Sequence, residues 1–98
     1  MKDKNEKCIA DMYLASALFA YGARLLKVDR DDRRRQKFCF DVTTVEHIFT
    51  IQSGNTVRLV PKPSIEVIEN EFIAKTLLFP PNYPDAIRSI KSAIHVSD

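Results

Sequence analysis

The sequence predicts an α+β domain in which an N-terminal and a C-terminal helix pack on one face of a small antiparallel sheet of three to five strands. The first observation behind this prediction is an almost wholly apolar run over 12–21, enclosed by an aspartate and a glycine. The second is an alternation of apolar and polar residues over 35–42, which is typical of a half-buried strand. The third is an apolar stripe at helical spacing from Tyr83 to Ile94.

Length and composition indicate one small globular domain. Ninety-eight residues leave room for a single domain with a thin core. Hydrophobic residues make up 45% and charged residues 29% of the chain, which excludes a disordered protein. A net charge of +2 predicts neither nucleic-acid nor membrane binding by itself. We expect residues 1–7 to form a flexible tail, because they lack apolar periodicity, and residues 8–98 to form the domain.

The first helix has a start and a stop in the sequence. Asp11 is suited to accept from backbone amides of the first turn and to meet the positive end of the helix dipole. Gly22 lies where a left-handed residue commonly ends a helix. Since few polar residues lie between them, the helix is expected to be covered on more than one side. It is therefore a central core helix or, alternatively, a core helix with one side in an oligomer interface.

Two strands are expected to follow this helix. Residues 24–29 alternate, and in 35–42 the side chains of Phe38, Phe40 and Val42 share one face. The charged stretch 30–35 between them is too polar to bury, so we expect a solvated hairpin turn.

Residues 43–60 allow two predictions. Thr43 with Glu46 forms a candidate capping box, which favours a short helix followed by a strand. The abundance of Thr, Ile, Val and Phe, and the turn sequence Ser53-Gly54-Asn55, instead favour a β-hairpin, and we prefer the hairpin. Prolines at 61 and 63 then end the element before them.

The last third of the chain predicts two helices joined by an extended segment. Ser64 caps a short helix whose apolar side carries Ile65, Ile68 and Phe72. Residues 75–79 are extended and apolar, and three prolines stiffen the loop after them. The final helix begins near 82–85, with Tyr83, Ile87, Ile90 and Ile94 as its buried stripe.

Three sequence patterns resemble a family of small domains of unknown function that is common in phages, prophages and other mobile elements. They are D-x-Y-L-A-x-x-L-x-x-x-G over 11–22, F-x-F over 38–40 and A-x-x-x-x-K-x-x-I over 86–94. The chain departs from the family between Val42 and Ser64, where it is longer by about a hairpin. The resemblance implies a phage or mobile-element setting, and it implies no catalytic residue.

The residues that would support catalysis, a metal or a cofactor are too few or too scattered. Gly22 and Gly54 are the only glycines, so a phosphate-binding loop is not expected. The four candidate zinc ligands have no ligand spacing; they are Cys8, Cys39, His47 and His95. A Cys39–His47 nucleophilic pair is conceivable, but a packed structural cysteine is the commoner case. We therefore expect a non-enzymatic protein without cofactor or metal.

The cysteines and the N-terminal stretch indicate in which compartment of the cell the protein is expected. Neither Cys8 nor Cys39 belongs to a C-x-x-C motif, so we expect two reduced thiols rather than a disulfide. The apolar run after the tail is short and contains Asp11, which argues against a signal peptide and a membrane-spanning helix. We expect the protein to stay in the cytoplasm, of a bacterial host or an infected cell, and not to bind membranes.

The basic residues carry the one functional hint. Six surround the turn at 30–35 and two lie on the last helix: Lys27, Arg30, Arg33, Arg34, Arg35, Lys37, Arg88 and Lys91. A basic ribbon can lie along phosphates, although the interleaved acids Asp29, Asp31 and Asp32 favour a merely solvated turn.

Two functions follow as hypotheses. The first is a non-enzymatic accessory binding module of a phage or mobile element that contacts nucleic acid or a nucleoprotein complex through the basic hairpin. The alternative is a structural or protein–protein interaction module, such as a virion or assembly accessory, an inhibitor of a host protein or a homo-oligomer. The apolar first helix, which exceeds what so small a core can cover, motivates this alternative.

Overall fold

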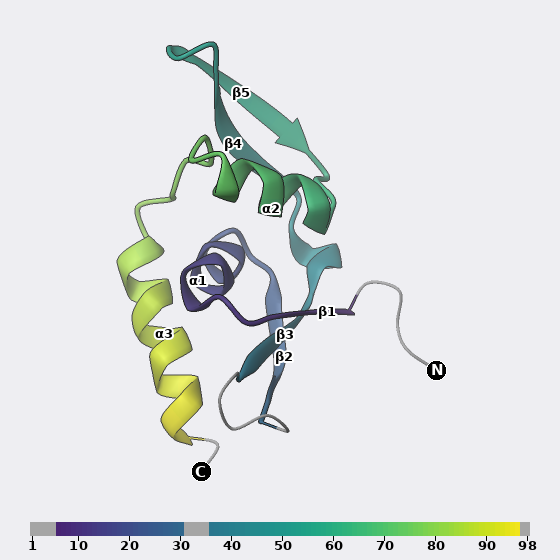
Figure 1. The fold of residues 1–98 in the computed structure, drawn as a ribbon, viewed down its shortest axis with the longest axis vertical. Coiled ribbons are helices and arrows are strands. Elements are labelled where there is room, and N and C mark those ends of the chain that lie inside the picture. The colour runs from purple at the N-terminus through teal and green to yellow at the C-terminus, as the bar shows by residue number, and fades with distance from the viewer. Residues whose placement is uncertain (1–5, 31–35, 97–98) are drawn as a thin grey trace.

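The computed structural model describes residues 6–30 and 36–96 and has the α+β architecture that we expected (Figure 1). In chain order, its elements are β1 (Glu6–Ile9), α1 (Met12–Ala20), β2 (Arg24–Asp29), β3 (Lys37–Asp41), the short 3₁₀ helix η1 (Val42–Thr44), β4 (His47–Gln52), β5 (Thr56–Pro61), α2 (Ile65–Ile73) and α3 (Tyr83–Val96). The five strands form two antiparallel sheets instead of the single sheet that we expected.

The first sheet has the strand order β1-β3-β2. Phe38 and Phe40 of β3 point into the core, and both are almost completely buried. Strand β1 is an addition to our prediction, because Glu6 and Lys7 pair with β3 and do not belong to a tail. The rest of the predicted tail, and most of the predicted turn, lie outside the described residues.

A disulfide joins Cys8 of β1 to Cys39 of β3, which corrects our expectation of two reduced thiols. The two residues are 31 positions apart in sequence, but they lie directly opposite each other in the β1–β3 ladder. The expectation was wrong because residues 6–9 have too little apolar alternation to be predicted as a strand, and the sulfur atoms meet only through that strand pairing.

Helix α1 is capped at both ends as predicted. The Asp11 carboxylate accepts from the amides of Tyr13 and Leu14, at 2.8 and 3.1 Å. At the other end, Gly22 has a φ of 100°. Its amide and that of Ala23 donate back to the carbonyls of Phe19 and Leu18, respectively, which satisfies the last turn in a Schellman motif.

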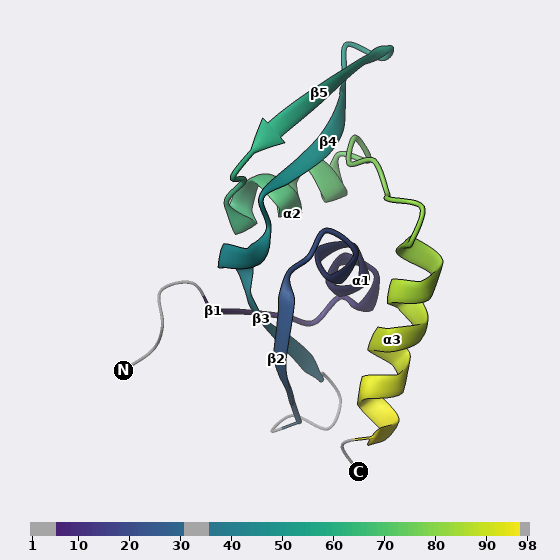
Figure 2. The same cartoon turned by 180° about the vertical axis from the view of Figure 1, so that it is seen from behind.

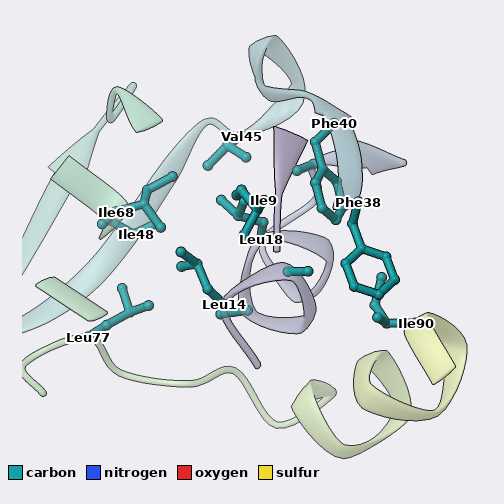
Figure 3. Close-up of a cluster of buried hydrophobic side chains, with 13 residues drawn as sticks. Ile9, Leu14, Leu18, Phe38, Phe40, Val45, Ile48, Ile68, Leu77 and Ile90 are labelled. Atoms are coloured by element: carbon teal, nitrogen blue, oxygen red, sulfur yellow. The ribbon is translucent and has the colours of Figure 1, made fainter. Parts of the chain in front are cut away.

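Helix α1 is also the centre of the molecule. It lies between the first sheet and α3, and α2 lies between it and the β4–β5 hairpin (Figures 1 and 2). Its side chains from Leu14 to Leu18 are buried, and Ile90 of α3 lies beside Phe38 of β3 in the same cluster (Figure 3). The stripe predicted for α2 is confirmed, since Ile68 is completely buried and Ile65 and Phe72 pack against the core. In α3, Tyr83, Ile90 and Ile94 belong to the buried side as predicted, but Ala86 is buried where Ile87 was expected, and Ile87 is only half-buried.

The β-hairpin that we preferred for residues 43–60 is formed by residues 47–61. β4 pairs with β5 from His47↔Pro61 to Gln52↔Thr56, around a turn in which Gly54 has a φ of 81°. The capping box is not formed. Thr43 instead lies within η1, where the Asp41 carboxylate accepts from its backbone amide at 3.0 Å and from its hydroxyl at 2.6 Å. This turn redirects the chain after β3, so the hairpin builds a separate sheet.

The extended segment after α2 closes one edge of that second sheet. The Ile51 amide donates to the Thr76 carbonyl at 2.8 Å, and the Leu78 amide donates to the Phe49 carbonyl at 2.9 Å. These bonds flank an isolated antiparallel bridge between Thr50 and Leu77. The hairpin is therefore tied to the body of the protein along β4 and leaves β5 at the outside (Figure 1).

Candidate protein-binding surface

The hairpin presents apolar side chains on the face that points away from the core. Strand alternation directs Ile48 and Thr50 inward, and both are completely buried. The opposite face carries two cross-strand pairs, Phe49↔Leu59 and Ile51↔Val57, which we call the outer hairpin face. Three of these side chains are large and exposed: Phe49 at 40%, Leu59 at 51% and Val57 at 58%.

A groove of about 460 Å³ opens where this face meets the end of α1 and the loop before α3. We call it the aromatic groove, and its lining residues are Ala20, Tyr21, His47, Phe49, Leu78, Phe79, Pro80 and Pro81. None of them is an acid, a lysine or an arginine. Such a lining suits an apolar or aromatic ligand and does not suit a phosphate or an acidic substrate.

The Tyr21 hydroxyl holds the groove together. It donates to the Leu78 carbonyl at 2.5 Å and accepts from the Phe49 amide at 3.2 Å. It thereby ties the end of α1 to both β4 and the 76–81 segment. Burial raises the pKa of Tyr21 above its ordinary value, in spite of the opposing effect of the Phe49 amide, so the hydroxyl is neutral and able to donate at neutral pH.

Ring contacts fix the aromatic side chains around the groove. Phe79 stacks on Tyr83 with a centroid distance of 4.4 Å, and it meets Phe72 edge-on at 6.3 Å. His47 meets Phe49 edge-on at 5.3 Å. Phe79 nevertheless remains 47% exposed, so its position is set while much of its surface is available to a ligand.

The Cys39–His47 pair that we considered as a nucleophile and base is not formed. Cys39 is completely buried and its sulfur is bonded to Cys8, whereas His47 is exposed on the second sheet. Among the side chains that the structure describes, over residues 6–30 and 36–94, no group of three or more His, Cys, Asp or Glu residues is placed to hold a metal ion.

The structure does not gather the predicted basic contact residues into one patch. Lys27 and Lys37 are exposed on the face of the first sheet that points away from α1, and Lys37 lies opposite Asp29. Arg30 is half-buried at the end of β2. The remaining candidates lie elsewhere: Arg33, Arg34 and Arg35 are outside the described residues, and Arg88 and Lys91 are exposed on α3.

Acidic side chains offset much of the positive charge on the ribbon formed by β2 and β3. Besides the Lys37–Asp29 pair, Arg24 lies opposite Asp41 in the β2–β3 ladder. Hydrogen bonds from Thr43, assisted by the charge of Arg24, lower the pKa of the Asp41 carboxyl, which is therefore ionised at neutral pH. On α3, Arg88 lies 3.6 Å from the Asp85 carboxylate. The described part of the ribbon thus carries mixed charge.

Sequence reasoning missed the groove although it named some of its parts. The alternation in β4 placed His47, Phe49 and Ile51 on one face of the candidate strand, and the prolines at 80 and 81 predicted a stiff loop. Whether that face points into the core or outward depends on which elements cover it, and this information is not local.

No helix in the described part of the chain is long and apolar enough to cross a bilayer. In comparisons with known proteins, no family model, no curated protein and no solved structure matches this chain.

Proposed function

We propose that this protein is a non-enzymatic binding module that docks a short, extended, proline-containing segment of a protein partner in the aromatic groove. The observation that carries the proposal is the groove itself, where Phe49 and Phe79 remain 40% and 47% exposed although other rings and the Tyr21 hydroxyl hold the site in place.

A proline-containing segment suits this lining for two reasons. Proline-rich chains adopt the extended polyproline II conformation before binding, so little conformational entropy is lost when they dock on rings. The pyrrolidine ring is also apolar and flat enough to stack on an aromatic side chain. Because the groove offers no lysine, arginine or acid, binding is expected to depend only weakly on salt.

A titration followed by NMR tests this function. The probes are a ten-residue polyproline peptide and a Gly/Ser peptide of the same length, added to the ¹⁵N-labelled chain. We expect the polyproline peptide alone to shift the amide signals of Phe49 and Phe79. Phe79→Ala is expected to weaken binding at least tenfold.

Ile73→Ala is the matched control for that variant, because Ile73 is a large apolar residue that is 73% exposed and does not line the groove. It should bind the peptide as the unchanged protein does. If the polyproline peptide causes no shift at 1 mM, or if both variants weaken binding equally, the proposed site is wrong.

A second candidate function is the nucleic-acid contact suggested by the basic hairpin. It is favoured by Lys27 and Lys37, which are both exposed on the same face of the β2–β3 ribbon. A salt titration of binding to a double-stranded DNA fragment, with Arg33, Arg34 and Arg35 changed to Glu, tests it. Loss of a salt-dependent affinity in the variant supports this function, and an unchanged affinity excludes it.

The setting in a phage or mobile element and the cytoplasmic location both remain proposals. Location is linked to the Cys8–Cys39 bond, because cytosolic thiols are usually kept reduced. Rapid alkylation of the protein in its native cells, followed by mass spectrometry, would count its free thiols. Two alkylated cysteines support the cytoplasm, and an intact disulfide points to an oxidising compartment.

A further inference from the structure

The open edge of β5 is a second feature of the hairpin, and it is independent of the groove. The bonds from Ile51 to Thr76 and from Leu78 to Phe49 show that odd-numbered residues of β4 direct their backbone groups away from β5. The even-numbered residues of β4 therefore bond to their β5 partners, such as Arg58 opposite Thr50. It follows that the amides and carbonyls of Val57 and Leu59 point to the outer edge of the sheet.

Nothing in the described part of the chain pairs with this edge, since β5 has β4 as its only strand neighbour there. Figures 1 and 2 show β5 along the outside of the molecule. The two residues that offer their backbone groups also carry exposed apolar side chains, Val57 at 58% and Leu59 at 51%. Backbone and side chains at this edge are therefore both suited to strand addition.

The edges of the first sheet differ in this respect. β1 is only four residues long and carries Glu6 and Lys7. β2 has a register irregularity between Leu25 and Lys27 and carries several charges. Short strands, bulges and charged side chains are the usual protection of an edge against pairing, whereas β5 has six residues and a single charge, Arg58.

We propose that β5 pairs with the β5 strand of a second copy of this chain, antiparallel and with the two-fold axis at Arg58. In this register, Val57 of each copy lies opposite Leu59 of the other. Since both residues point their backbone groups outward, the two pairs form four interchain hydrogen bonds. The result is one sheet that runs through both copies in the strand order β4-β5-β5-β4.

The sequence of β5 fits a copy of itself for three reasons. Val57 of one copy and Leu59 of the other both point their backbone groups toward each other, so each of these amides donates to a carbonyl of the other copy. Pro61 lacks an amide, but in this register it lies opposite Asn55 at the end of the ladder. The Arg58 side chain lies on the other face, where its guanidinium is 2.8 Å from the Glu71 carboxylate. This ion pair offsets the repulsion between the two Arg58 side chains that meet at the axis.

The contact between the two copies is small. One six-residue strand pairing buries less than the roughly 800 Å² per partner of a standard interface. We therefore expect a reversible, concentration-dependent dimer and not an obligate one.

Cysteine cross-linking tests the register. At the axis, the two copies of residue 58 form a non-hydrogen-bonded pair with Cβ atoms about 4.5 Å apart, which a disulfide can span. Arg58→Cys in the full chain is therefore expected to form a disulfide-linked dimer under mild oxidation, with the 58–58 linkage identified by peptide mapping. Thr56→Cys is the control, because its two copies would lie about 14 Å apart. Equal cross-linking of the two variants, or of neither, would overturn the proposal.

Sedimentation analysis from 10 µM to 1 mM tests the edge itself. Leu59→Pro removes an amide that points outward, so the bonds between β4 and β5 remain and the hairpin is expected to fold. We expect the unchanged chain to dimerise in this range, Leu59→Pro to stay monomeric and Leu59→Ala, which keeps the amide, to dimerise within tenfold of the unchanged chain. Circular dichroism checks that the variants are folded. If the unchanged chain is monomeric at 1 mM, even if its edge captures a peptide of another protein, edge pairing between copies is refuted. The same holds if the two Leu59 variants lose dimerisation equally.

Discussion

Removal of the Cys8–Cys39 disulfide is expected to cost this domain a large share of its stability. The bond links residues 31 positions apart and encloses α1, β2 and the start of β3. For a closed loop of this length, the chain-entropy relation gives about 3.7 kcal/mol at 25 °C. A domain of this size has a total stability of about 5–15 kcal/mol, so the variant would lose a quarter or more of it.

The assay is urea unfolding of the oxidised protein and of the double variant Cys8→Ala/Cys39→Ala, followed by circular dichroism. With an m-value of about 1.5 kcal/mol/M, the midpoint is expected to fall by about 2.5 M. The oxidised protein should show no titratable thiol in urea, and after reduction it should unfold near the variant. A midpoint change below about 0.5 M, or two free thiols in protein prepared under oxidising conditions, would refute the reasoning.

The remaining predictions concern caps and one titration. Lys75 has a φ of 62° at the end of α2, so Lys75→Gly should raise the free energy of unfolding, measured by thermal denaturation, by about 0.5–1 kcal/mol. Gly22 has a φ of 100°, so Gly22→Ala should lower the free energy of unfolding by about 1 kcal/mol or more. Asp11→Ala should cost about 1 kcal/mol in the same measurement, because two amides lose their acceptor. Burial raises the pKa of Tyr21 in the folded protein above its ordinary value of 10.0. The neutral Tyr21 hydroxyl therefore stabilises the folded state fully below pH 10, and this contribution is lost as the pH rises through the folded-state pKa. In urea unfolding, Tyr21→Phe should therefore be less stable than wild type at pH 7, by about 1 kcal/mol, and this difference should shrink above pH 10; a constant difference would contradict the assignment.

The elements of this protein were predictable wherever their causes are local. The Asp11 cap and the Gly22 stop act on amides and carbonyls within a few residues, so α1 could be placed from the sequence. The hairpin at 47–61 followed in the same way, because the abundance of β-branched residues and the turn at 53–55 are neighbours in the chain.

Three features depended on contacts between distant residues. The disulfide exists because β1 pairs with β3. The hairpin forms its own sheet because η1 redirects the chain after β3. Phe49 faces outward because residues 76–78 bond to the free edge of β4 and the core covers the opposite face of that strand. Alternation along a strand separates two faces but does not say which one the rest of the chain will cover. For this reason the composition of the candidate binding surface could be read from the sequence, whereas its exposure was decided by the tertiary structure.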